Sequence, residues 1–215
     1  MTGLRERKKA DTRRALSDAA VHLAFERGLD TVTREAIANL AGVSLRTFNN
    51  YFTGKYEALA YRQTERMRRS IAALRQRPAD EPLWTSITES VLEPLDADFA
   101  DLDHHENRVP SRKELAEVRK LLLRPEFRGA VSKELFEEWV TAIAERTGTD
   151  PERDMYPRLV SAIVLAVGEA ASEAYAMADP PLAITTLLRS AFDQVAAGLP
   201  VPTEAEGKSH GRRPR

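Results

Sequence analysis

The sequence predicts an all-α protein in which an N-terminal helix-turn-helix domain of three helices precedes a larger helical domain. Three observations predict this fold class: apolar residues recur at helical spacing, a glycine separates two short helical segments near residue 42, and charge divides the chain. Residues 1–77 carry 16 Lys and Arg against 8 Asp and Glu, whereas residues 78–215 carry 16 against 25. We therefore expect a basic front module that meets a polyanion; a merely solvated helix face is the alternative.

The composition limits the class of protein. With 215 residues and 42% hydrophobic content, the chain can bury a substantial core. It has no cysteine, which excludes disulfides and thiolate metal sites and fits a reducing compartment. The opening MTGLRERKKADTRR has no apolar secretory segment, and the longest apolar stretch, Leu159–Val167, is too short to cross a membrane. We expect a cytoplasmic protein with no membrane partner.

The first two helices are delimited by apolar spacing and by the residues at their ends. Leu16 and Leu23 belong to an apolar set at helical spacing, and Gly28 follows as a helix stop. This predicts a first helix of about twenty residues. Thr33 precedes a second apolar set that includes Ile37, so Thr33 is suited to cap a short second helix.

The stretch AGVSLRTFNNYF, residues 41–52, predicts a tight turn and a third helix. Gly42 is suited to the left-handed conformation that ends a helix, and Ser44 can cap the next helix. Phe48 and Phe52 lie four residues apart, so both can bury against the first helix. The polar residues around them then face outward or to the flanks. Two short helices around a glycine turn predict a helix-turn-helix.

The outward residues of this third helix are typical of DNA recognition. We expect Arg46 to read guanine and Asn50 or Asn49 to pair with adenine, because amide groups hydrogen-bond base edges. Tyr51 and Lys55 are better placed for phosphate oxygens, near a helix N-terminus that also attracts anions. The alternative is a small three-helix core whose polar residues face only solvent.

The run GLDTVTREAIANLAGVSLRTFNNYFTGKYEAL closely resembles the DNA-binding region of the TetR family of bacterial transcription regulators. The resemblance covers roughly residues 8–60 and implies a DNA-binding domain over 1–60, with a helical ligand-binding and dimerisation domain over 61–198. It also implies phosphate contacts by Thr33, Ser44, Tyr51 and Lys55, and a major-groove face formed by Arg46, Thr47, Asn49 and Asn50. Asn49 stands where the family frequently has an aromatic residue. The remaining tail, 199–215, lacks apolar periodicity and is expected to be disordered.

Apolar periodicity predicts further helices in the back domain. The fourth helix is expected to continue over Tyr61–Arg77, with others over Pro82–Leu95, Leu115–Leu122, Phe127–Ile143, Tyr156–Met177 and Leu182–Ala197. The last two have wide apolar faces that so small a monomer cannot both bury, which predicts a homodimer through these helices. Such a seam is usual in the TetR family. A core within one chain is the alternative for part of each face.

The effector site is less clearly marked in the sequence. Large side chains of the back domain could line an apolar chamber, or could be ordinary core: Met67, Trp84, Phe127, Phe136, Trp139, Met155 and Tyr175. The motif TFNNYF and the run RKELAEVRKLLLRPEF resemble a TetR subgroup whose C-terminal domain is described as binding acyl-CoA-like ligands. Basic residues of this region could then meet a CoA phosphate, or could simply solvate a helix: Arg112, Lys113, Arg119, Lys120, Arg124 and Arg128.

The sequence therefore predicts a ligand-responsive, homodimeric DNA-binding regulator: a repressor released from an inverted-repeat, double-stranded operator by a small apolar or acyl-CoA-like effector. An architectural DNA-binding protein without an effector is one alternative. A helical hydrolase using His104 or His105 is another, but no Gly-x-Ser-x-Gly elbow or phosphate-binding glycine loop accompanies these residues. The acidic, histidine-containing segment around them is more typical of a solvated loop than of a metal site. We expect no enzyme activity, cofactor or metal.

Overall fold

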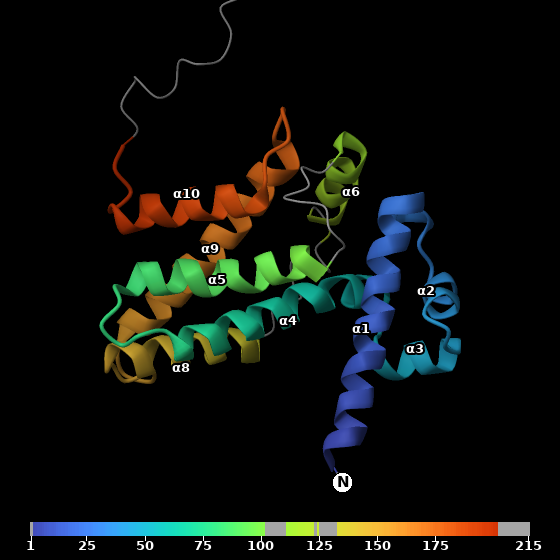
Figure 1. Cartoon of the computed structure of the whole chain (residues 1–215), viewed down its shortest axis with the longest axis horizontal. Coiled ribbons are helices and arrows are strands. Elements are labelled where there is room, and N and C mark those ends of the chain that lie inside the picture. Colours follow the sequence, from blue (N-terminus) through green and yellow to red (C-terminus); the bar gives the residue numbers. More distant parts are fainter. Residues whose placement is uncertain (1, 102–110, 123, 125–132, 202–215) are drawn as a thin grey trace, which may run out of the picture.

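The computed structural model describes residues 2–101, 111–122, 124 and 133–201, and every regular element in these ranges is helical (Figure 1). The all-α prediction is confirmed. Figure 1 shows α1, α2 and α3 at one end of the molecule and the larger helical domain at the other. The elements are α1 Thr2–Arg27, the 3-10 turn η1 Leu29–Thr31, α2 Arg34–Leu40, α3 Leu45–Tyr51, α4 Lys55–Gln76, α5 Leu83–Asp101, α6 Arg112–Leu122, α8 Lys133–Thr147, α9 Met155–Met177 and α10 Ile184–Ala196.

The front domain is built on apolar residues from its three helices. Leu16 and Leu23 of α1, Ile37 of α2 and Phe48 of α3 are buried in one cluster. The ring centroids of Phe48 and Phe52 lie 5.8 Å apart. The prediction that both phenylalanines bury against the first helix is confirmed. Because α3 is seven residues long and could not hold its shape alone, this packing is what fixes its position.

α4 belongs to both domains. Ala58 and Leu59, in its first turns, join the front cluster, whereas Ile71 and Leu74 join the back cluster formed with α5, α8, α9 and α10. Trp139 of α8 is among the largest fully buried side chains of that back cluster. One continuous helix therefore connects the two cores (Figure 1).

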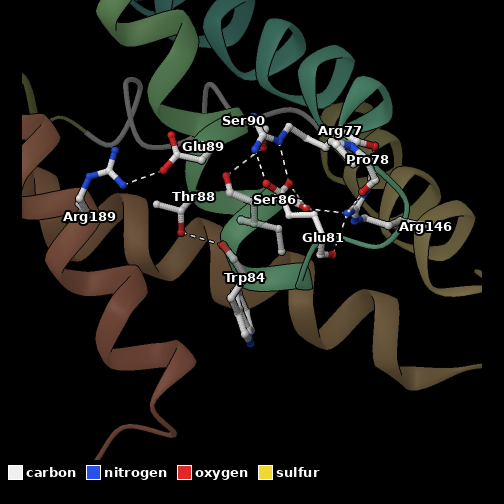
Figure 2. A network of polar contacts seen from close by, with 11 residues as sticks. Arg77, Pro78, Glu81, Trp84, Ser86, Thr88, Glu89, Ser90, Arg146 and Arg189 are labelled. Atoms are coloured by element: carbon white, nitrogen blue, oxygen red, sulfur yellow. Dashed lines mark hydrogen bonds and ion pairs between the residues drawn. The ribbon is translucent and has the colours of Figure 1, made fainter.

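A polar network closes the end of the back domain where α4 meets α5 (Figure 2). Arg77, just after α4, pairs with Glu81, which also accepts a hydrogen bond from Ser86 Oγ at 2.6 Å. Arg146 of α8 donates to the backbone carbonyls of Arg77, Pro78 and Glu81. The same guanidinium donates to Ser86 Oγ at 2.6 Å. The loop between α4 and α5 is thereby joined to α8.

Most predicted helices are present with shifted ends. The first helix has 26 residues rather than about twenty. The predicted helix Phe127–Ile143 corresponds to α8 from Lys133 onward. Residues outside the described ranges include Phe127, Arg128, His104, His105 and most of the tail, 202–215. Within the described ranges no group of three His, Asp or Glu side chains is arranged to hold a metal ion.

α9 is apolar over a longer stretch than the Leu159–Val167 segment singled out in the sequence. Among the described residues it is the one helix long and apolar enough to cross a membrane by length and composition, with a mean hydropathy of 1.4 over an 18-residue window. The Leu159–Val167 stretch is thus part of a longer apolar segment. A single such helix is weak support for a membrane span. Only 28% of that window is buried inside the protomer, so much of this apolar helix lies at the surface.

Candidate nucleic-acid interface

Backbone and side-chain hydrogen bonds fix the turn between α2 and α3. Thr33 Oγ1 accepts a hydrogen bond from the Ala36 N–H at 3.1 Å, so the predicted cap of α2 is confirmed. Gly42 has a φ of 69°, which side chains rarely tolerate, and the Val43 N–H then donates to the Ala38 carbonyl at 2.9 Å. The chain can therefore leave α2 and enter α3 within a few residues.

Ser44 caps α3, as predicted. Its Oγ accepts a hydrogen bond from the Thr47 N–H at 3.0 Å and lies 2.8 Å from the Thr47 hydroxyl. The two hydroxyls therefore hold each other at the start of the recognition helix. A phosphate contact by Ser44 and a groove contact by Thr47 remain predictions. Both contacts are compatible with the bonds described here, because a hydroxyl can donate one hydrogen bond and accept others.

The outer face of α3 is free to meet a partner. Phe48 is fully buried, whereas Arg46, Asn49 and Asn50 are exposed. Within the described residues these three side chains have no hydrogen bond or ion pair. Their orientation follows from helical spacing once Phe48 points into the core. This face thus presents one guanidinium and two amides, the groups that read base edges in a major groove.

Tyr51 ends α3 and is half-buried. The guanidinium of Arg13, on α1, lies 5.9 Å from the centroid of its ring. This contact joins the end of the recognition helix to α1. Its role as a phosphate ligand remains a prediction.

Lys55 has a structural role that the sequence did not reveal. Its ammonium donates hydrogen bonds to the backbone carbonyls of Leu29 and Val32, both at 3.0 Å. Two of its three donors are therefore used to hold the loop between α1 and α2 against the start of α4. A phosphate contact by Lys55 remains a prediction, and it would have to use the third donor.

A carboxylate of α6 is bonded to the corner between α1 and α2, which sequence reasoning missed. Glu117 is buried, and its Oε2 accepts a hydrogen bond from the Leu29 N–H at 2.7 Å. That bond, with a second from Lys120 at 2.8 Å, holds the pKa of Glu117 below its ordinary value. Gly28 has a φ of 93°, and a Cβ there would lie 3.7 Å from Glu117 Oε2. The sequence places Glu117 among basic residues, which was the available signal for a buried or paired acid. Its partner Leu29 could not be predicted, because it lies 88 residues away in the sequence.

Further contacts of α6 strengthen this connection. Lys113 Nζ donates to the Glu26 carbonyl at 3.3 Å, and Arg124, just after α6, pairs with Asp30 at 3.0 Å. Of the basic residues considered for a CoA phosphate, Lys113, Lys120 and Arg124 therefore have protein partners. Arg112 pairs with Asp179. The front domain is consequently joined to the back domain by α6 as well as by α4.

The described candidates for an effector chamber lie at different depths in the back domain. Trp139 is 1% exposed, Met67 and Trp84 pack partly buried against the back core, and Phe136 and Tyr175 are half-buried. Burial raises the pKa of the Tyr175 hydroxyl. Met155 begins α9 and is 76% exposed in the protomer, so its place in an effector chamber stays a prediction.

Two open hollows on the surface contain none of these residues. One, of about 560 Å³, lies between α4 and α8 and is lined by Arg75, Lys133, Glu134, Glu137, Glu138 and Thr141. The other, of about 420 Å³, lies between α5 and α10 and is lined by Leu92, Asp96, Thr185, Thr186, Arg189, Ser190 and Asp193. Both are open to solvent and lined mainly by charged or hydroxyl-bearing residues, so neither is the enclosed apolar pocket that an apolar ligand favours.

Family comparisons agree with this geometry. A family model described as bacterial regulatory proteins of the tetR family matches residues 16–60, which contain α2 and α3. A second, described as the MftR C-terminal domain of the same family, matches residues 81–200, more than half of the chain.

Whole-chain relatives have the same organisation. The HTH-type transcriptional regulator TcmR of Streptomyces glaucescens is 33% identical over 199 residues, covering 90% of this chain and 86% of that protein. The fold resembles the fatty acid degradation regulator FadR of Bacillus halodurans (TM-score 0.55, 21% identity, 87% and 96% of the two chains). It also resembles Thermus thermophilus FadR, solved with lauroyl-CoA (TM-score 0.55, 18% identity, 90% and 97%). The chain therefore belongs to the TetR family and is a DNA-binding transcriptional regulator, not an enzyme.

Proposed function

We propose that this regulator is a cytoplasmic, homodimeric repressor that binds an inverted-repeat operator through α3 and releases it when a small apolar or acyl-CoA-like effector binds. Residues 1–60 form the reader and residues 61–198 the effector-binding and dimerisation domain. The observation that carries the proposal is the exposed, unpartnered set Arg46, Asn49 and Asn50 on a helix anchored by Phe48. Two such helices, about 34 Å apart in a dimer, would enter successive major grooves.

The exposed apolar side of α9 supports the dimer. Tyr156 and Leu159 are 47% and 49% exposed. Ala162, Ala166 and Ala170, which follow Leu159 at helical spacing, are also exposed. Small side chains let a second helix approach closely, and a two-fold dimer would bury this surface against its own copy. α10 contributes less, because Leu188 and Phe192 already pack inside the protomer.

Among the described residues, the back core has a buried polar group that an effector could bind. The Trp139 indole Nε1 is buried and has no hydrogen-bond acceptor among the described residues. A buried N–H without an acceptor is costly, so an effector carbonyl that accepts this bond would gain by binding there. The lauroyl-CoA bound by the Thermus relative has this chemistry, a thioester carbonyl on an apolar chain. An acyl-CoA-like effector therefore suits Trp139 better than a pure hydrocarbon.

Two connections can carry the effector signal to the reader. α4 passes from the back core to the front core, and α6 is bonded to the α1–α2 corner through Glu117 and Leu29. A shift of either helix would change the separation of the two recognition helices in a dimer. Operator affinity would fall because only one separation matches the grooves.

The test is binding-site selection with the wild type and Arg46→Ala. We expect an inverted repeat for the wild type and, for the variant, a loss of about 1–3 kcal/mol concentrated at one base position per half-site. Arg153→Ala is the matched control, because Arg153 is an exposed cation of the back domain. An unchanged base preference for Arg46→Ala would remove this residue from direct readout. Sequence-independent binding by the wild type would instead favour the architectural alternative.

A further inference from the structure

The N-terminal half of α1 lies outside the core of the front domain. Leu16 is the first residue of α1 in the buried cluster, and residues 5–11 are all exposed. The family model of the DNA-binding domain also begins at residue 16. Packing in the front core therefore does not account for the exposed residues 5–11, which also lie outside the region that the family model matches. A helical segment without a buried apolar face offers a partner chiefly its charge.

Helical geometry sorts the charges of this segment onto two faces. Residues 2–15 contain six Lys and Arg against two acids. At about 100° per residue, five residues from Arg5 onward fall within about 140° of arc. We call them the basic stripe: Arg5, Lys8, Lys9, Thr12 and Arg13. Glu6 borders the stripe, whereas Arg7, Asp11 and Arg14 lie on the opposite face.

The basic stripe begins beside the last residue of α3. Arg13, at one end of the stripe, contacts the ring of Tyr51, the last residue of α3. Arg5 lies eight residues earlier, about 12 Å farther along the helix axis. Figure 1 shows this end of α1 extending past α3, away from the back domain. The stripe therefore starts at the recognition helix and leads outward from it.

Three cations of the stripe have no counter-charge among the residues that the structure describes. Arg5, Lys8 and Lys9 form no ion pair with any described residue. Other cations near this helix do: Arg62 pairs with Asp18 at 3.3 Å, and Arg66 pairs with Asp98 at 3.0 Å. Three unpaired cations on one face of an exposed helix complement a regular row of anions, such as a phosphate backbone.

We propose that the basic stripe is a second DNA contact, which binds backbone phosphates flanking the groove that α3 enters. This inference rests on the proposed function, because α3 must first bring the stripe to DNA. The stripe carries no amide group, so it adds affinity without sequence preference. In a dimer the two stripes would extend the contact at both half-sites.

The test compares two double variants that remove the same charge from opposite faces of α1. Arg5→Gln/Lys9→Gln removes two stripe cations, and Arg7→Gln/Arg14→Gln is the matched control. Glutamine forms helices about as well as Lys and Arg, and circular dichroism checks that both variants fold. Affinity for a selected operator and for an unrelated duplex is measured by fluorescence anisotropy at several salt concentrations.

We expect the stripe variant to bind both duplexes more weakly. The slope of log K against log salt should become shallower by up to about 3.6, or about 0.9 for each of four lost contacts per dimer. The control should keep nearly the wild-type slope. Equal slopes for the two variants, whether changed or unchanged, would overturn the proposal. Failure of the proposed function would be distinguished by the separate Arg46→Ala experiment. If α3 does not read base edges, that variant keeps the base preference of the wild type.

Discussion

At the scale of single residues, buried or paired charges decide how this protein responds to its conditions. Hydrogen bonds from Arg77 and Ser86 lower the pKa of Glu81 to about 2, below the ordinary value of 4.5. Because the pKa is lowered in the folded state, Glu81 contributes stability above pH 4.5, and this contribution is lost as the pH falls toward 2. The network of Figure 2 should therefore weaken in acid.

Glu81→Gln tests this prediction. The melting temperature of the variant should lie below that of the wild type at pH 6, and the difference should shrink as the pH is lowered from 5 toward 3. Thermal unfolding followed by circular dichroism measures both. Glu152→Gln, at an exposed position in the loop before α9, is the control and should show no such trend. A difference for Glu81→Gln that is constant with pH would contradict the linkage.

Trp139 is the residue that tests the effector. Trp139→Phe keeps an aromatic ring in the back core but removes the buried N–H. With lauroyl-CoA as the probe, we expect wild-type operator binding to weaken. The variant should need roughly 2- to 12-fold more probe for the same effect, the equivalent of one hydrogen bond of about 0.5–1.5 kcal/mol. An identical response in both proteins would exclude this N–H from effector binding. Native mass spectrometry would show any effector that copurifies.

At the scale of elements, helix ends follow local chemistry and helix faces follow packing. Thr33, Gly42 and Ser44 are where their residue types predict, because caps and positive φ values involve only neighbours in sequence. The extension of α1 to Thr2 was missed, because the segment before Leu16 lacks the apolar spacing that reveals a helix. The exposure of Met155 could not be predicted for a related reason: hydrophobicity does not show which side of α9 faces the core.

The exposed side of α9 leads to a prediction for the whole element. Ala166→Arg places a long cation on the surface proposed as the dimer seam, so it should convert the dimer to a monomer and abolish tight operator binding. Ala72→Arg, at an exposed position of α4, is the control. Analytical ultracentrifugation measures the mass of each. A dimeric Ala166→Arg variant would place the seam elsewhere.

At the scale of the whole molecule, the two domains are joined by contacts between residues far apart in sequence. α4 carries apolar residues into both cores, and Glu117 of α6 is bonded to the Leu29 N–H at the α1–α2 corner. The second connection is polar and buried, so its loss leaves an unsatisfied backbone group. The reader is therefore not a freely attached module.

Glu117→Ala should lower the free energy of unfolding by about 1–3 kcal/mol, since the Leu29 N–H loses its acceptor. It should also weaken operator binding without changing the salt slope, because Glu117 does not face DNA. Chemical unfolding and anisotropy at several salt concentrations measure the two effects. Arg119→Ala, on the exposed side of α6, is the control. Wild-type operator affinity in Glu117→Ala would mean that α6 does not position the reader.

The sequence by itself determined the fold class, the caps and turn of the helix-turn-helix, and the outward face of α3. These features depend on periodicity and on neighbours within a few residues, and both can be seen in a single sequence. Only the tertiary structure decided that Lys55 holds two carbonyls, that Glu117 joins α6 to α1, and that Arg13 aligns α1 with Tyr51. Such contacts join residues 23 to 88 positions apart, and pairing at that distance is set by how helices pack, not by local preference.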